Sequence, residues 1–482
     1  MIIRLMFSFL LLISAFTFAQ NSDLPTDYLP AEFHAARRDS LRSLMAPNTV
    51  AVVFAFPTRN FSNDVDYIYH QNPDMYYFSG YKEPHSMLFI FKEEQSGSDG
   101  SKFKEALFVQ KRNPLAEQWT GKRLGVEGAK TQLKIGTVYN GEDFQKFGLD
   151  LTRFDSIYLD MLPIDVSDSR NDKADLFDLL GQFREKAGVP ADFTQNKKLN
   201  TRAYRHYTGV LRQIKTAEEI DLLRKAVEIS CIGQLEVMKA VKADMSEGEI
   251  QGLHEFVHKK YGAEYIGYPS IVGAGNNGCV LHYIENNKTK VGNQLILMDV
   301  GAEYHGYTAD VTRTIPANGK FSAEQKIIYN LVYDAQEAAF KLCKEGTDWV
   351  ELNNAARKIL AAGLIKLGII SKEQEVSRYY PHSLGHHIGL DVHDRNSTRE
   401  IKKGMVITIE PGIYIPENSP CDKKWWGIAV RIEDDLLIRE NDYELLSGAA
   451  PRKAEEVEKA IAMKSALDDF NLPALRSNKK AF

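Results

Sequence analysis

The second half of the chain carries helical patterns whose starts and stops are marked by capping residues. Thr216 and Glu219 have the spacing of a capping box, and the apolar positions behind them repeat at helical spacing. Ser246 and Glu249 repeat the box, and Gly262 supplies a stop for that second helix. Two long helices are therefore predicted at the start of this half.

Two further helices and several apolar runs follow. Ser322 opens a third helix, and a fourth is predicted for residues 348–367 with Gly368 as its stop. Short apolar runs predict strands at residues 295–300, 311–315, 405–409 and 428–438. This half therefore combines helices with a sheet, and we expect the helices to lie on one side of that sheet.

The first half has a more mixed pattern in which strands are prominent. Residues 50–56 and 86–91 predict strands, and residues 175–187 predict a helix. The pattern changes near residues 206–215, so the fold class is α+β, with a smaller mixed α/β N-terminal domain before a C-terminal domain. The predicted organisation is a leader at residues 1–19, an N-terminal domain at 20–208, a C-terminal domain at 209–460 and a tail at 461–482.

The leader has the pattern of a secretory signal peptide. Arg4 precedes an apolar run, and Thr17 and Ala19 are small enough for the -3 and -1 positions of a cleavage site. The run is shorter than the roughly 20 apolar residues that span a membrane, so we expect cleavage rather than an anchor. The mature protein is expected to be exported, periplasmic or secreted, without a stable membrane anchor.

The composition narrows the classes of function. Apolar residues make up 44% and charged residues 26% of the chain, which is typical of a globular protein and not of a disordered one. The net charge is -5 and no block of like charge stands out, so we expect no nucleic-acid partner. The four cysteines are scattered without a CxxC pair, which excludes a disulfide scaffold and a zinc ribbon.

Two aspartates stand at neighbouring strand ends. Asp299 ends one apolar run, Asp310 begins the next, and the segment between them can form a turn. If the hairpin is centred on Tyr304 and His305, the two aspartates lie opposite each other with Cβ atoms about 4.5–5.5 Å apart. Two like charges this close need neutralisation, which a metal ion would supply. An off-centre turn would instead leave one aspartate facing solvent, and this pair alone does not decide between them.

A histidine cluster lies later in the same half. His382, His386, His387 and His393 fall within residues 381–394, where two glycines and a proline argue against a regular helix. A loop or a strand edge is therefore predicted. Histidine together with several carboxylates suits Mn, Fe, Co or Zn.

Two glutamates complete the candidate site. Glu410 ends an apolar strand, and Arg431 and Glu433 share one face of a later strand because side chains alternate along it. A carboxylate at a buried strand end is costly unless it is paired or metal-bound. More than three carboxylates suggest two metal ions, which would lie about 3.5–4 Å apart.

These segments resemble a known family. The chain contains, in this order, DVGAEYHGYTADVTRT, HSLGHHIGLDVHD, TIEPGIYI and VRIEDD. They resemble the metal-binding segments of the pita-bread metallopeptidases, which include aminopeptidase P, prolidase and methionine aminopeptidase. The resemblance covers about residues 215–450 and implies a C-terminal pita-bread catalytic domain with two divalent metal ions. Mn2+ is the favoured ion, and Co2+ or Zn2+ are alternatives.

The resemblance also implies roles for single residues. The metal ligands would be Asp299, Asp310, His386, Glu410 and Glu433, with Asp310 and Glu433 bridging the two ions. Glu410 would also be the general base. His282 and His393 match histidines that bind the substrate and stabilise the reacting centre, and His382 and Arg431 match further catalytic positions.

The first half narrows the choice within the family. Residues 67–84 and 119–125 resemble segments of aminopeptidase P, and residues 211–226 resemble its linker and first helix. Two residues depart from the pattern: His70 stands where aminopeptidase P often has Arg, and His387 stands at a position that is usually apolar or aromatic.

The resemblance implies an aminopeptidase that releases the first residue from peptides with proline at the second position, by attack of a hydroxide bridging two metal ions. Proline lacks an N–H and its ring fixes φ, so ordinary peptidases handle it badly. A prolidase, which takes only Xaa-Pro dipeptides, and a pita-bread binding protein without catalysis are the alternatives. A homo-oligomer, dimer or tetramer, is expected because the family often forms them.

One competing motif lies on a predicted helix. His254, Glu255 and His258 match HExxH, the helical zinc-protease motif. No third ligand follows at a recognisable spacing, and the same helix carries an ordinary apolar stripe. We therefore interpret this motif as a chance match.

Overall fold

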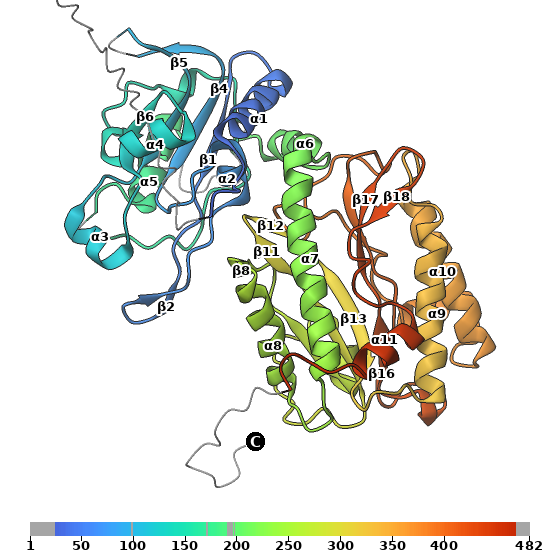
Figure 1. The fold of residues 1–482 in the computed structure, drawn as a ribbon. Helices are drawn as coiled ribbons and strands as arrows, with labels where there is room; N and C mark the ends of the chain where they lie inside the picture. Colours follow the sequence, from blue (N-terminus) through green and yellow to red (C-terminus); the bar gives the residue numbers. More distant parts are fainter. Residues whose placement is uncertain (1–24, 98–99, 170–171, 190–195, 197, 469–482) are drawn as a thin grey trace, which may run out of the picture.

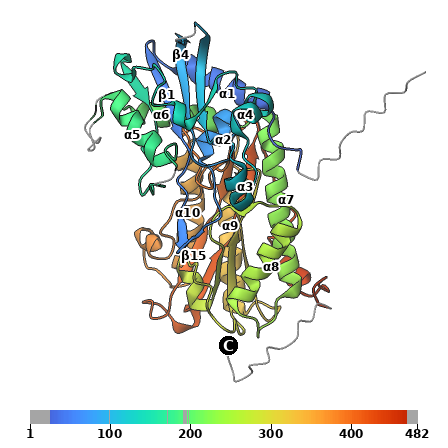
Figure 2. The same cartoon turned by 90° about the vertical axis from the view of Figure 1, so that its left-hand side faces the viewer.

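The computed structural model describes residues 25–97, 100–169, 172–189, 196 and 198–468. Two domains lie one above the other, and the long helix α7 descends from their junction along one side of the lower domain (Figures 1 and 2). The predicted leader at residues 1–19 lies outside the described residues, as do residues 469–482 of the predicted tail. Among the described residues, no helix is long and apolar enough to cross a bilayer.

The N-terminal domain is built on a mixed sheet with the strand order β6-β5-β4-β1-β7. Its strands are β1 (Thr49–Phe54), β4 (Met87–Ser96), β5 (Lys102–Val109), β6 (Val138–Asn140) and β7 (Ser156–Tyr158), beside a separate hairpin of β2 (Asn60–Ser62) and β3 (Val65–Asp66). Its helices are α1 (Ala31–Leu44), α2 (Pro73–Ser79), α3 (Pro114–Thr120), α4 (Gly125–Leu133) and α5 (Leu176–Ala187). The pairs β1–β4 and β4–β5 are antiparallel, whereas β1–β7 and β5–β6 are parallel.

Helices cover both faces of this sheet. Phe54 of β1 packs with Phe183 of α5 on one face, and Val53 packs with Leu41 of α1 on the other. This two-sided burial explains why β1 is a continuous apolar run rather than an alternating one. The strand stops at Phe54, slightly before its predicted end, and β4 runs past its predicted end to Ser96.

The C-terminal domain follows helix α6 (Thr201–Arg212). Its helices are α7 (Ala217–Ala240), α8 (Glu247–Lys260), α9 (Ala323–Phe340), α10 (Trp349–Lys366) and α11 (Ala454–Ile461). Its strands are β8 (Tyr265–Ile266), β9 (Ile271–Ala274), β10 (Leu295–Val300), β11 (Ala302–Tyr304), β12 (Tyr307–Thr308), β13 (Val311–Pro316), β14 (Val406–Ile409), β15 (Gly412–Ile415), β16 (Ile428–Arg431), β17 (Asp434–Ile438) and β18 (Tyr443–Leu445). They pair in small sheets, β13-β10-β9, β12-β11-β8, β14-β17-β18 and β15-β16.

The four predicted helices of this domain begin at the predicted caps, and α8 and α10 end just before the predicted glycines. The N-caps are Thr216, Ser246, Ser322 and Asp348, and the first three form complete capping boxes. Gly262 and Gly368 follow α8 and α10 with φ of 89° and 68°, a left-handed conformation that glycine adopts without steric cost. The limits of these four helices are therefore determined by residues next to the helix ends.

The hairpin that carries Asp299 and Asp310 has a different centre from the predicted one. Asp299 pairs with Thr312, because the turn falls on His305 and Gly306, whose φ values are 50° and 88°. Two consecutive left-handed residues are typical of a type I′ turn. Of the two alternatives that the sequence left open, direct opposition of the aspartates is wrong. The turn is off-centre, but neither aspartate faces solvent, because both are buried. The shift is an even number of positions, so both aspartates still lie on one face of the hairpin.

The run at residues 428–438, predicted as one strand, is two. β16 pairs with β15, whereas β17 pairs with β14, and the chain changes partner at Ile432 and Glu433. The backbone N–H of Glu433 donates instead to the carbonyl oxygen of Thr312, at 3.1 Å. The break therefore joins this segment to β13.

Helices cover one face of β10 and leave the other face free for a site. Ile296 and Met298 pack with Val237 of α7 in the main core, whereas Leu297 packs with Tyr414 on the opposite face. Asp299 continues this alternation and points away from α7. The prediction that the helices lie on one side of the sheet is confirmed for this strand.

The two domains share a hydrophobic core. Leu41 of α1 and Tyr77 of α2 belong to the same buried cluster as Leu223 of α7 and Tyr307 of β12. A continuous apolar core favours one fixed arrangement of the two domains, because separating them would expose that surface to water.

Candidate active site

Four carboxylates meet at strand ends of the C-terminal domain. Asp299 lies in β10, Asp310 precedes β13, Glu410 follows β14 and Glu433 precedes β17. All four line one cavity of about 540 Å³ together with His386. The structure therefore brings together the five residues that the sequence proposed as metal ligands.

Two buried glutamines hold the strand ends that carry these acids. Gln234 of α7 donates from Nε2 to the carbonyl oxygens of Met298 and Val311, which adjoin the two aspartates, at 3.1 and 2.7 Å. Gln336 of α9 donates in the same way to the carbonyl oxygens of Ile409 and Ile432, which precede the two glutamates, at 3.0 Å each. Each pair of acids is thus fixed by one helix.

The Tyr268 hydroxyl lies between the two aspartates. It is 2.6 Å from Asp299 Oδ1 and 2.5 Å from Asp310 Oδ1, and Arg431 Nη2 donates to the other oxygen of Asp299. Burial raises the pKa of Asp299, but Arg431 and the hydrogen bond from Tyr268 together outweigh this effect and bring the pKa below its usual value. Burial and the charge of Asp299 raise the pKa of Asp310. The nearby imidazole of His386, which acts in the opposite direction, does not outweigh these two effects.

His386 is oriented by its outer nitrogen. Nδ1 lies 3.0 Å from the carbonyl oxygen of His387, so Nδ1 carries a proton. Nε2 lies 3.4 Å from Asp310 and 3.5 Å from Glu410. Burial lowers the pKa of His386, but the two carboxylates outweigh it and raise the pKa to about 9. An outer N–H held by a carbonyl, with the inner nitrogen turned to the site, is the usual arrangement of a metal-binding histidine.

Glu433 is buried beside Thr312, whose hydroxyl donates to Oε2 at 2.6 Å. Its Oε1 has no hydrogen-bond partner among the described residues. Burial and the charges of Asp310 and Glu410 raise the pKa of Glu433 well above its usual value. A buried carboxylate oxygen without a partner is costly unless a cation binds there.

Glu410 completes the group. Burial raises its pKa to about 8, although His386 and Arg431 act in the opposite direction. Ligand atoms of Asp310, His386 and Glu433 lie within 4.8 Å of one another. Several carboxylates with one imidazole are a donor set that fits divalent transition-metal cations.

A second line of polar contacts ends at His382. Arg431 Nη1 donates to the Tyr414 hydroxyl at 2.9 Å, and that hydroxyl lies 2.8 Å from His382 Nε2. His382 Nδ1 lies 2.8 Å from the carbonyl oxygen of Ser383, so Nδ1 carries the ring proton. Nε2 then accepts a hydrogen bond from the Tyr414 hydroxyl. Burial and Arg431 lower the pKa of His382 to about 4, so this imidazole is neutral at pH 7.

His282 and His393 line the same cavity with exposed side chains. The ring of His393 stands edge-on to that of His386, with the centroids 4.3 Å apart. A cleft of about 690 Å³ adjoins the cavity along His393 and runs to His70 and Glu303 between the domains. The cavity therefore opens into a longer groove.

Comparison with known proteins agrees with this site. Residues 34–156 match the model for the N-terminal domain of aminopeptidase P, and residues 221–440 match metallopeptidase family M24. The Xaa-Pro aminopeptidase of Escherichia coli is 35% identical over 438 residues, which cover 88% of this chain and 96% of the relative. The chain belongs to the aminopeptidase P family of M24 metallopeptidases.

Further members of the aminopeptidase P family are similar over the same length. The Xaa-Pro aminopeptidase of Haemophilus influenzae is 34% identical over 453 residues, which cover 89% of this chain and 97% of the relative. The structure of Escherichia coli aminopeptidase P with the inhibitor Pro-Leu matches with a TM-score of 0.78 and 32% identity, covering 90% of this chain and 98% of that chain. The predicted fold is confirmed, and the chain is a hydrolase of the metallopeptidase class.

Three polar residues of this aminopeptidase P site were not predicted from the sequence, namely Thr312, Tyr414 and Tyr268. Thr312 stands two residues after Asp310 on the same strand face, so strand alternation could have indicated it. Tyr414 lies on the strand that follows the Pro-Gly turn after Glu410, so strand alternation could have indicated it too. Tyr268 lies in the segment between β8 and β9, where no pattern in the sequence points to the site.

The two departures from the aminopeptidase P pattern have different surroundings. His387 is buried, and its ring stacks on Trp349 with the centroids 6.0 Å apart, so it packs away from the acids. Burial lowers the pKa of His387 to about 3. His70 lies in the cleft, where its Nε2 is 2.9 Å from both carboxylate oxygens of Glu303. His70 therefore belongs to the groove and His387 to the core.

The HExxH histidines are core residues of α8. His254 and His258 pack beneath Gly233 of α7, and their ring nitrogens have no hydrogen-bond partner in the described part of the chain. Neither belongs to a group of three potential metal ligands there. Burial lowers the pKa of His258 to about 4. The interpretation of this motif as a chance match agrees with these contacts.

Proposed function

We propose that this chain is a metal-dependent aminopeptidase that releases the first residue from peptides with proline at the second position. The observation that carries the proposal is the cavity in which four acids and His386 meet three further histidines, His282, His382 and His393. Similarity to Xaa-Pro aminopeptidases along both domains supports the same activity.

The metal ligands in this proposal are five residues that line the cavity, namely Asp299, Asp310, His386, Glu410 and Glu433. The unpartnered oxygen of Glu433 supports a cation at this place. They would hold two divalent ions, with Mn2+ favoured and Co2+ or Zn2+ as alternatives. When bound, the ions lower the pKa of water and polarise the substrate carbonyl.

The residues of the chain would divide the remaining work. Glu410 takes the proton of the attacking water and returns it to the departing proline nitrogen, as a general base and then a general acid. His282 and His393 donate to the oxygen of the substrate carbonyl as its negative charge develops. His382, kept neutral and oriented by Tyr414, and Arg431, paired with Asp299, fix the shape of the site.

The groove favours an aminopeptidase over a prolidase. A dipeptide would fill only the cavity at the acids, whereas the adjoining cleft gives room for the chain beyond the proline. A prolidase would not require that extension. The proposal therefore includes peptides of three or more residues as substrates.

The setting of the enzyme is part of the proposal. The signal-peptide pattern of residues 1–19 supports export to a periplasm or the outside of the cell. The family often forms dimers or tetramers, so we propose a homo-oligomer. Peptides, and neither nucleic acid nor a membrane, are the proposed partners.

A length series of peptides tests the proposal. We expect the Mn2+-loaded protein to release the first residue from Xaa-Pro-Xaa and longer peptides, and to act far more slowly on matched peptides with alanine in place of proline. Cleavage of Xaa-Pro dipeptides alone would favour the prolidase. Metal analysis that finds fewer than one ion per chain after Mn2+ addition, with no hydrolysis, would favour the non-catalytic binding protein.

A further inference from the structure

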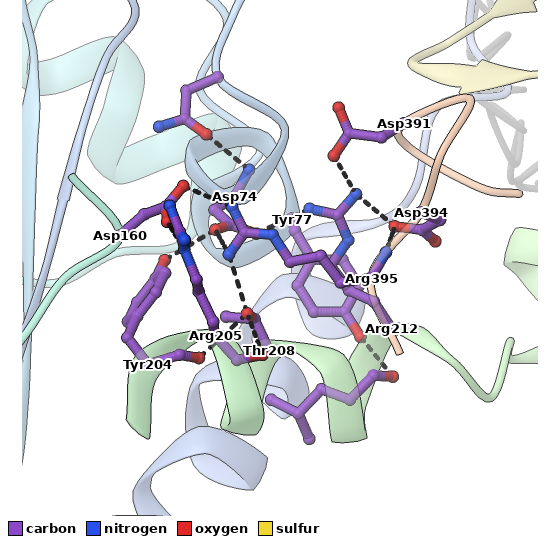
Figure 3. A network of polar contacts seen from close by, with 12 residues as sticks. Asp74, Tyr77, Asp160, Tyr204, Arg205, Thr208, Arg212, Asp391, Asp394 and Arg395 are labelled. Carbon is purple, nitrogen blue, oxygen red and sulfur yellow. Dashed lines mark hydrogen bonds and ion pairs between the residues drawn. The ribbon is translucent and has the colours of Figure 1, made fainter. Parts of the chain in front are cut away.

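The segment that carries His393 is tied to the N-terminal domain by ion pairs that meet at the buried Arg212 (Figure 3). Asp391 and Asp394 flank His393, and both carboxylates face the guanidinium of Arg212 at the end of α6. The distances to Arg212 Nη2 are 2.7 Å for Asp391 and 2.5 Å for Asp394. The guanidinium of Arg212 therefore forms ion pairs with this segment on both sides of His393.

Arg212 is in turn held by the N-terminal domain. Its Nη1 donates to Asp74 Oδ1 in α2 at 2.9 Å, and the Tyr204 hydroxyl donates to Asp74 Oδ2 at 3.0 Å. The side chains of Arg212 and Asp74 are 1% and 2% exposed, so this pair is shielded from solvent. A buried charge pair with several hydrogen bonds holds its geometry more strictly than a surface pair.

Two further positively charged side chains, Lys215 and Arg395, belong to the same network. Lys215 Nζ donates to Asp394 Oδ2 at 2.9 Å, and Arg395 Nη2 donates to Asp160 of the N-terminal domain at 2.6 Å. Arg395 Nη1 also lies 3.2 Å from Asp74. Both sides of the domain boundary therefore contribute charges to the same network.

The backbone allows this close approach only at small residues. A Cβ on Gly209 of α6 would lie 2.7 Å from the carbonyl oxygen of Asn396, and a Cβ on Gly389 would lie 2.1 Å from Asp394 Oδ2. Contacts this short are not tolerated in folded proteins. α6 and the His393 segment are therefore in direct contact.

His393 itself makes no side-chain hydrogen bond among the described residues, and its ring contacts the ring of His386. The direction of its imidazole is therefore set by the backbone of its segment, and that backbone is fixed through Asp391 and Asp394. We propose that Arg212, anchored by Asp74, is a positioning residue that sets His393 for the substrate and makes the activity depend on the N-terminal domain. This inference rests on the role proposed for His393.

The alternative interpretation is that these ion pairs only stabilise the contact between the two domains. The two readings differ in what happens once His393 is gone. A positioning network has nothing left to position in His393→Ala, whereas a fastening network keeps its full effect there. A double-mutant cycle separates these cases.

The experiment measures kcat/KM of the Mn2+-loaded full chain on an Xaa-Pro-Xaa peptide. Asp391→Asn removes one of the two ion pairs between Arg212 and the His393 segment. Asp74→Asn removes the charge that holds Arg212, and Asp74 is buried and lines neither the cavity nor the cleft. We expect each to lower kcat/KM about 10-fold in the wild-type background. In the His393→Ala background, each of these two substitutions should lower kcat/KM less than 2-fold. In the His282→Ala background, where His393 is present, each should again lower kcat/KM about 10-fold.

Asp27→Asn is the matched control. Asp27 also joins the N-terminal segment to the C-terminal domain, through Lys225 at 2.8 Å, and its side chain is 45% exposed against 43% for Asp391. It has no contact with the His393 segment in the described structure, so it should change kcat/KM less than 2-fold. Thermal unfolding midpoints check that every variant is folded.

Equal losses in the wild-type and His393→Ala backgrounds would overturn the positioning role, as would an Asp74→Asn or Asp391→Asn variant that behaves like Asp27→Asn. These outcomes leave the proposed peptidase activity standing. Failure of the proposed function would show differently, as a wild-type chain that binds Mn2+ and hydrolyses no Xaa-Pro peptide.

Discussion

Tyr268 lies with its hydroxyl 2.5 Å from Asp310 Oδ1, and Asp299 Oδ1 is 2.6 Å away on the other side. A hydroxyl has one proton, so it can donate to only one of these carboxylates at a time. The oxygen that does not receive this proton faces the hydroxyl oxygen instead, and a bound cation would stabilise it there. Tyr268 is thus a hydrogen-bonding partner of two proposed ligands.

Tyr268→Phe should weaken metal binding. Loss of a hydrogen bond to a ligand typically costs about 10–100-fold in metal affinity, and we expect a loss in that range with activity largely restored at saturating Mn2+. Calorimetric titration of the metal-free protein with Mn2+ measures it. Tyr265→Phe is the control, because the Tyr265 hydroxyl donates to the carbonyl oxygen of Tyr69 instead. Unchanged affinity in Tyr268→Phe would contradict its role.

Glu410→Gln should abolish turnover and leave the fold intact. The amide neither accepts the proton of water nor binds a cation as a carboxylate does, and removal of a general base costs about 10²–10⁴-fold in rate. Peptide hydrolysis and the thermal unfolding midpoint measure the two effects. Glu417→Gln, a nearby exposed change, should stay active. Full activity in Glu410→Gln would sink the two-metal assignment.

In the metal-free protein, the contribution of Glu410 to stability should fall as the pH rises. Burial raises the pKa of Glu410 from 4.5 to about 8, so the folded state holds a proton that the unfolded chain releases. The stability from this proton is fully present below about pH 4.5 and is lost as the pH rises through about 8, with a slope of at most about 1.4 kcal/mol per pH unit.

Urea unfolding at pH 5 to 8 measures that loss, with and without Mn2+. A bound cation takes the place of the proton, so the stability gap between the metal-loaded and metal-free forms should widen with pH. In the metal-free form, the stability of the wild type minus that of Glu410→Gln should fall from pH 5 to 8, because the amide does not titrate. A gap that narrows with rising pH would be the opposite result.

His254→Ala combined with His258→Ala should remain active. Both rings are buried in α8 away from the acids, so the change leaves a cavity and lowers the free energy of unfolding by about 2–5 kcal/mol. The number of bound metal ions should not change. A folded but inactive double variant with fewer ions would revive the HExxH interpretation.

Local patterns carried most of what the sequence could predict. The capping boxes at Thr216, Ser246 and Ser322 gave helix starts that the structure keeps, because a cap depends only on residues within one turn. The hairpin register was wrong because it depends on the backbone of His305, a residue other than glycine with positive φ. No spacing in the sequence distinguishes that turn from one centred a residue earlier.

Contacts between distant segments were beyond the sequence patterns. Tyr268 reaches Asp299 and Asp310 only through the packing of β8 and β9 on the hairpin, and Arg212 meets Asp394 only because the two domains share a core. The ligand candidates themselves were found because carboxylates at the ends of apolar strands are unusual wherever they occur. Their chemistry is local, whereas their supports are not.

Gln234 and Gln336 divide the catalytic domain into two halves, one that holds the aspartates and one that holds the glutamates. A cation held by acids from both halves would act as a removable cross-link between them. The free energy of metal binding would then also be free energy of closing the domain, and a chelator would loosen the architecture as well as stop the chemistry. Loss of the metal would then weaken the contact between the two halves of the domain as well as stop the reaction.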